Sequence, residues 1–270
     1  MVESAFTMPA SAQAESTLAA SPAVLPYSDL ADLVTGSPLV AKAYVERVRK
    51  VDLPGTSTQP EPQKYLLIEA RIDALIRGDG GLPPLVSFLA PALSEQDKKT
   101  SIWRKKQVIL LFAHPGSKAG EVRLTSSRHA AQRWNAEMEN TVRNIATELV
   151  ASDSPPAVTG IGDAFHTAGT ISGEGETQIF LKTTTSQPVS ISITRRPGQK
   201  PHWGVSLGEI VDESALPPSP DTLLWYRLAC SLPARLPASA VRGLPLLDAE
   251  AAHRDYRLVI ESLGSCGRTL

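Results

Sequence analysis

The sequence is short of cysteine, of aromatic residues and of net charge, and each shortage excludes a class of protein. Its 270 residues include 2 cysteines, 5% aromatic residues and a formal net charge of −1. Two cysteines are too few for a small disulfide-rich scaffold. Balanced charge disfavours a dedicated nucleic-acid binder, which carries a basic excess. No unbroken apolar run reaches about 18 residues, so no transmembrane helix is predicted.

The common cofactor motifs are also missing. Walker A, H-E-x-x-H and EF-hand patterns are absent, and Gly160-Ile161-Gly162 lacks the third glycine of a dinucleotide-binding loop because position 165 is Phe. The sequence therefore gives no support to an ATPase, a nicotinamide-dependent enzyme or a zincin. We expect no cofactor and no metal site, and the sequence resembles no characterised family.

Proline, in contrast, is abundant. The 22 prolines make up about 8% of the chain, against a typical usage of about 5%. Proline interrupts helix interiors and central strands, so we expect few long uninterrupted elements. Residues 1–26 are rich in Ala, Ser, Pro and Thr and cannot bury enough apolar surface to offset the entropy of ordering. We predict a disordered tail there.

The compartment has two open alternatives. Ala12-Gln13-Ala14 has the small-x-small form of a signal-peptidase site, but the basic and apolar regions of a signal peptide are missing before it. Either the tail is cytoplasmic, or the start codon is misplaced and the tail is the remnant of a signal, which makes the protein periplasmic or exported. We prefer export. In an exported protein Cys230 and Cys266 would pair.

The first half of the chain predicts a small β-barrel. Apolar residues alternate in five short segments separated by turn-forming residues, which is typical of a barrel. The order and lengths of these segments resemble an OB-like barrel, although no motif marks that fold. We expect the barrel domain over residues 27–127. It begins with a short helix at 29–34, and its strands follow at 39–51, 65–77, 85–89, 108–113 and 121–125.

The second half predicts an α+β arrangement over residues 128–270. Apolar residues three or four apart indicate a helix at 134–149, and clean alternation at 177–183 and 189–194 indicates an antiparallel hairpin. The fold class is therefore α+β: the barrel, a helix, an antiparallel β-meander and C-terminal helices. The remaining expected elements are strands at 163–171, 176–184, 189–195 and 203–211 and helices at 221–231 and 248–263.

Two patterns raise the alternative of a hydrolase. Residues 204–208 match G-x-S-x-G around Ser206, but the flanking residues lack the strand and helix that a nucleophile elbow needs. Asp163, His166 and Glu174 supply carboxylates and an imidazole for acid–base work or metal binding, at a spacing that matches no known ligand signature. These four residues are weak catalytic candidates.

Two cationic segments indicate binding rather than catalysis. Residues 98–106 hold four lysines, Arg104 and Trp103, which suits a single-stranded nucleic-acid binder that uses the barrel. The loop that ends in Trp203 carries Arg195, Arg196 and His202, and loops often carry function. We expect this loop, with Trp225 on the next helix, to be the binding surface.

From these patterns we expect a non-enzymatic soluble accessory or binding protein that contacts another protein, because every catalytic pattern lacks its structural context. The ligand stays unknown, and nucleic acid is disfavoured as a partner by the charge balance. The alternatives are a hydrolase that uses Ser206 or the Asp163/His166/Glu174 group, and a single-stranded nucleic-acid binder that uses the barrel.

Overall fold

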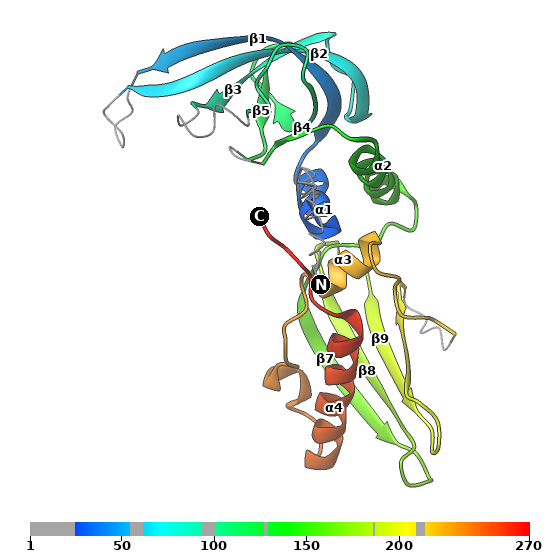
Figure 1. Cartoon of the computed structure of the whole chain (residues 1–270). Coiled ribbons are helices and arrows are strands. Elements are labelled where there is room, and N and C mark those ends of the chain that lie inside the picture. The colour runs from blue at the N-terminus through cyan, green and yellow to red at the C-terminus, as the bar shows by residue number, and fades with distance from the viewer. Residues whose placement is uncertain (1–24, 55–61, 93–100, 127–128, 186, 209–213) are drawn as a thin grey trace, which may run out of the picture.

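Two antiparallel sheets lie at opposite ends of the molecule, with helices between them (Figure 1). The computed structural model describes residues 25–54, 62–92, 101–126, 129–185, 187–208 and 214–270. Most of the expected tail, residues 1–24, lies outside the described residues, as do residues 209–211 of the strand expected at 203–211. The predicted α+β class is confirmed.

The first sheet is a nearly closed barrel. Its strands pair in the order β3-β2-β1-β4-β5, and a parallel bridge between Ser87 and Glu121 brings the two ends together. The Ser87 amide donates to the Gly120 carbonyl at 2.8 Å. The strands are β1 (Leu39–Leu53), β2 (Gln63–Arg77), β3 (Leu85–Pro91), β4 (Val108–Pro115) and β5 (Val122–Leu124).

The barrel confirms the OB-like prediction and adds one strand to it. Strand β6 (Ala131–Arg133) pairs with β4 beyond the expected end of the barrel at residue 127. Three residues are too few to produce a detectable alternation of apolar side chains. Strand β4 is buried on both faces from Ile109 to Ala113, as its unbroken apolar run predicts for a central strand.

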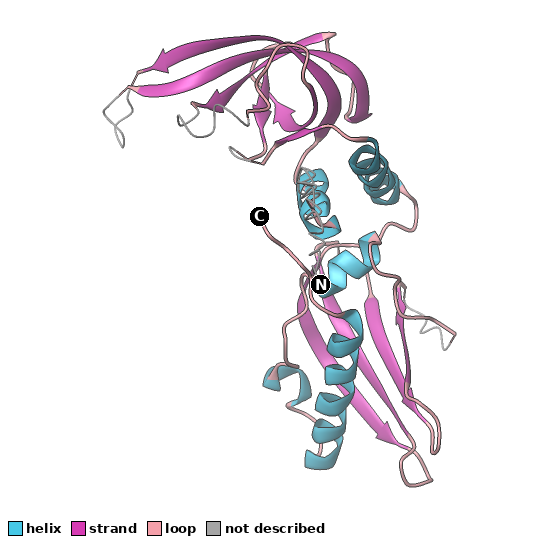
Figure 2. Ribbon diagram, viewed as in Figure 1, coloured by secondary structure: helices cyan, strands magenta, loops and turns pink. Residues whose placement is uncertain are grey.

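The second sheet is the predicted meander. Its order is β10-β9-β8-β7 and every pair of neighbours is antiparallel. Helix α4 (Leu246–Leu263) lies along one face of this sheet (Figure 2). The strands are β7 (Val158–Ala168), β8 (Gly175–Thr183), β9 (Val189–Arg195) and β10 (His202–Ser206).

Helices fill the space between the sheets: α1 (Tyr27–Thr35), α2 (Ala136–Val150) and α3 (Leu223–Ala229), with the short 3-10 helix η1 (Ala238–Val241) beside β7. Helix α4 begins before the expected cap at Asp248: Pro245 is the N-cap residue, and Asp248 lies in the first turn, where a negative charge favours the helix. It ends, as expected, at Gly264, whose φ of 73° favours glycine.

Several contacts tie the barrel to the helices. One apolar cluster includes Val40 and Phe112 of the barrel together with residues of the helices and the second sheet. The guanidinium of Arg77 donates to the carbonyls of Val34 and Ser37 at 2.6 and 2.7 Å, which satisfies the C-terminal end of α1. Lys42 lies between two carboxylates, 3.2 Å from Asp73 and 3.6 Å from Glu139 of α2.

The C-terminal segment returns to α1. The sulfur atoms of Cys230 and Cys266 lie 2.07 Å apart, a disulfide bond. Beyond it, Arg268 pairs with Asp32 at 2.6 Å, and the Thr269 amide donates to the buried carboxylate of Asp29 at 3.0 Å. Among the described residues no helix is both long and apolar enough to cross a membrane.

Candidate functional site

The candidate site lies at the end of the second sheet where the β7–β8 turn and the β9–β10 turn meet. The register places Thr167 opposite Glu176, Glu176 opposite Thr194, and Thr194 opposite His202. Cross-strand neighbours of this kind point to the same face. Alternation sends the buried apolar residues of the neighbouring positions, such as Ile179 and Ile193, to the other face, toward α4. A row of four polar side chains therefore crosses the outer face.

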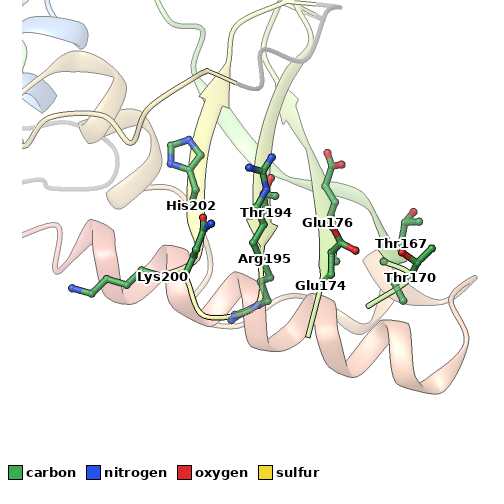
Figure 3. A pocket seen from close by; sticks show the side chains of 13 residues that line it. Thr167, Thr170, Glu174, Glu176, Thr194, Arg195, Lys200 and His202 are labelled. Atoms are coloured by element: carbon green, nitrogen blue, oxygen red, sulfur yellow. The ribbon is translucent and has the colours of Figure 1, made fainter. Parts of the chain in front are cut away.

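The two turns complete a pocket around this row. Its volume is about 760 Å³ and it opens to solvent. The β7–β8 turn and the β9–β10 turn both contribute, so residues about 30 positions apart in the chain face one hollow (Figure 3). The lining residues are Thr167, Ala168, Gly169, Thr170, Glu174, Gly175, Glu176, Thr194, Arg195, Arg196, Gln199, Lys200 and His202.

Acidic and basic side chains occupy opposite sides of the pocket. Figure 3 shows Glu174 and Glu176 on one side, Lys200 and His202 on the other, and Arg195 between them. Carboxylates accept hydrogen bonds, whereas Lys and Arg donate them. The pocket can therefore hold a ligand that carries both donors and acceptors, such as a polar stretch of polypeptide.

A buried polar network supports the pocket from below. On the inner face, Asp255 of α4 is fully buried and forms an ion pair with Arg195. The hydroxyl of Thr177, also fully buried, donates to the same carboxylate. His166 Nδ1 lies 2.8 Å from that hydroxyl and 3.9 Å from the carboxylate. A buried carboxylate needs such partners, because an unpaired charge in the interior is costly.

Arg195 links the network to the pocket. Its Nε donates to Asp255 on the inner face, while the residue also lines the pocket. Two glycines allow close packing at the same place. A Cβ atom on Gly175 would lie 2.9 Å from the His166 ring, and one on Gly169 would lie 2.4 Å from the Glu174 side chain. The end of the sheet is therefore held in one arrangement by buried charge and by close contacts.

The structure separates the acid–base candidates. Ala164 and His166 face α4, so Asp163, which is exposed, points to the outer face with Phe165. Glu174 lies in the turn after β7 and lines the pocket. His166 approaches a different carboxylate, that of Asp255. Among the described residues no group of three or more His, Cys, Asp and Glu side chains is arranged to hold a metal ion.

Ser206 ends β10 on the outer face and is buried opposite Ser190 of β9. Helix α4, which carries His253, lies on the other face of the sheet. No helix begins in 207–208 or 214–222, the described residues between β10 and α3. The surroundings of Ser206 thus differ from the strand-to-helix elbow of a serine hydrolase.

The two candidate tryptophans lie apart from the pocket. Trp203 and Trp225 are buried, and their indole N–H groups donate to Ser262 Oγ at 3.1 Å and to the Leu263 carbonyl at 2.9 Å. Both rings pack at the C-terminal end of α4. Of the residues expected to form the binding surface, Arg195, Arg196 and His202 line the pocket, and Glu174 joins them.

Sequence reasoning missed Asp255 and Thr177. Each is an ordinary residue in an amphipathic element, and no motif surrounds them. One signal was present: the apolar spacing of α4 places Asp255 beside Ala252 and Val259 on the buried face, where a carboxylate requires a partner. No family model and no curated protein matches this chain in sequence.

Proposed function

We propose that this chain is a non-enzymatic binding protein that acts outside the cytoplasm and holds a polar segment of a partner protein in the pocket at the end of the second sheet. The observation that carries the proposal is the convergence of Glu174, Arg195, Arg196 and His202 on one hollow from two separate turns.

The chemistry of the lining supports a polypeptide partner. A peptide segment offers amide donors, carbonyl acceptors and charged side chains, and the pocket matches them with two carboxylates, three hydroxyls and several cations. Support from Asp255 beneath Arg195 keeps part of the lining fixed. A site that is fixed before binding loses less entropy when the partner arrives.

The Cys230–Cys266 bond supports a location outside the cytoplasm. Disulfides persist in oxidising compartments and are rare where glutathione and thioredoxin keep thiols reduced. Intact mass of freshly isolated native protein, with and without reductant, tests this point. We expect a difference of two hydrogen masses; free thiols in the isolated protein would contradict an oxidising location.

A photo-crosslinking side chain at Thr170 tests the binding proposal. Thr170 is exposed and lines the pocket, whereas Val150, 75% exposed at the end of α2, lies outside it and serves as the control position. In the source organism we expect a discrete adduct with another protein from position 170 that Arg196→Glu abolishes. No adduct, or the same adduct from position 150, would overturn the proposal.

The hydrolase alternative has its own test. A broad serine-directed activity probe should leave the folded wild-type protein unlabelled. Labelling that disappears in Ser206→Ala would replace the binding proposal with an enzymatic one.

A further inference from the structure

A second hollow lies on the outside of the barrel, far along the chain from the pocket of the second sheet. Its volume is about 410 Å³. Strands β1 and β2 and the loop before β4 contribute the lining residues: Tyr44, Val45, Glu46, Arg47, Glu69, Arg71, Lys105 and Lys106. Four of these eight residues are cations, although the whole chain is nearly neutral.

Backbone hydrogen bonds of Lys106 and its neighbour Gln107 hold this loop against β1. The Lys106 amide donates to the Val45 carbonyl at 2.7 Å, and the Val45 amide donates to the Gln107 carbonyl at 2.9 Å. Lys106 has a φ of 69°, a left-handed conformation that disfavours residues other than glycine. The loop thus fixes Lys105 and Lys106 against the middle of β1 at a conformational cost.

The arginines of the hollow already hold carboxylates. Arg71 pairs with Glu46, and Glu69 accepts from Arg49 at 2.7 Å and lies 3.5 Å from Arg47. Among the described residues no carboxylate pairs with Lys105 or Lys106. The hollow therefore combines arginines that already pair with carboxylates of this chain and two exposed lysines whose ammonium groups face solvent.

We propose that this hollow is a second binding site, which takes an acidic peptide segment rich in Asp or Glu. Carboxylates of the segment pair with Lys105 and Lys106, as Glu46 and Glu69 pair with the arginines of the hollow. Charge complementarity selects the class of partner. A single-stranded nucleic acid is disfavoured, because such sites stack bases on several aromatic rings and this lining holds one, that of Tyr44.

Fluorescence anisotropy with a labelled oligoglutamate peptide tests this site. The test variant is Lys105→Ala/Lys106→Gly, in which glycine suits the left-handed position and so preserves the loop. We expect the affinity for the peptide to weaken as salt rises. In the variant it should fall by about five- to tenfold, because the variant loses two exposed ion pairs of the usual strength. Circular dichroism checks that the variant folds.

The matched control is Lys118→Ala/Lys182→Ala, which removes two exposed cations elsewhere and should leave the affinity unchanged. The adduct from position 170 should stay unchanged in Lys105→Ala/Lys106→Gly, so this test stands apart from that of the proposed function. The proposal would be overturned if the peptide did not bind or if the control lost as much affinity as the test variant. It would also be overturned if oligothymidylate or phosphatidylglycerol vesicles bound more tightly than the peptide.

Discussion

The barrel and the second sheet use charge in opposite ways. The barrel has an apolar interior and keeps its ion pairs on the outside, as with Arg71 and Glu46. The second sheet places a carboxylate, Asp255, in its interior and surrounds it with Arg195, Thr177 and His166. Exposed pairs are screened by water and contribute little, whereas removing one partner of a buried pair is expensive. Ion pairs of similar geometry in the two regions should therefore differ severalfold in their effect on the free energy of unfolding.

The largest expected effect comes from Asp255→Ala. The change leaves Arg195 without its partner and the buried Thr177 hydroxyl without an acceptor. We expect the free energy of unfolding to fall by about 3–5 kcal/mol, the usual cost of breaking a buried pair. Urea denaturation measures it. In Asp255→Leu/Arg195→Met most of the loss should be recovered; a double variant as unstable as the single would contradict the explanation.

Reduction of the Cys230–Cys266 bond should have the next largest effect. The bond closes a loop over a sequence separation of 36 residues and tethers the segment that reaches α1. Loop-closure entropy predicts a loss of about 4 kcal/mol on reduction. Thermal unfolding with and without reductant measures the loss, and Cys230→Ser/Cys266→Ser controls for effects of the reductant. A melting temperature unchanged by reduction would show that the rest of the contacts hold the segment alone.

The junction between barrel and α2 should show an intermediate effect that depends on pH. The Trp134 indole donates to Glu139 Oε2 at 2.6 Å, and this hydrogen bond, with Arg143 and Lys42, lowers the pKa of Glu139 below its ordinary 4.5. The unfolded chain therefore takes up the proton first. The stabilisation is complete above the ordinary pKa and is lost as pH falls through the lowered value.

Glu139→Gln tests this junction. The amide cannot ionise but can still accept from Trp134. Between about pH 6 and about pH 3, wild type should lose about 1 kcal/mol more than the variant, which is the usual net contribution of one hydrogen bond. Equal losses in the two proteins would show that Glu139 does not couple to the fold.

The smallest effect should come from the exposed pair on the barrel. Glu46→Gln removes the partner of Arg71, whose side chain is 64% exposed. We expect a change below about 1 kcal/mol that vanishes in high salt. Denaturation at low and high salt measures it. A loss as large as that of Asp255→Ala would erase the contrast between the two regions.

Much of the fold could be predicted from the sequence, because alternation and helical spacing report which side chains are buried. The strands at 65–77 and 85–89 and the end of α4 at Gly264 follow from such local patterns. The strand Ala131–Arg133 escaped prediction since three residues show no period. The boundary between barrel and second half remains a prediction.

The site was predictable only in part. Arg195, Arg196 and His202 stand together in the sequence as a cationic loop, so their contribution was visible before the structure. Asp255 was not, because its role depends on α4 packing across the sheet onto residues 60 and 78 positions earlier. Long-range pairing of this kind leaves no mark in a local pattern of residue types.

One double variant tests the buried network and the pocket above it together. Asp255→Leu/Arg195→Met should stay folded, yet it loses the guanidinium that links the buried network to the pocket lining. With the photo-crosslinker at position 170, we predict that this double variant loses the partner adduct although its stability is near that of wild type. A folded double variant that still gives the full adduct would contradict the claim that this end of the sheet is the binding site.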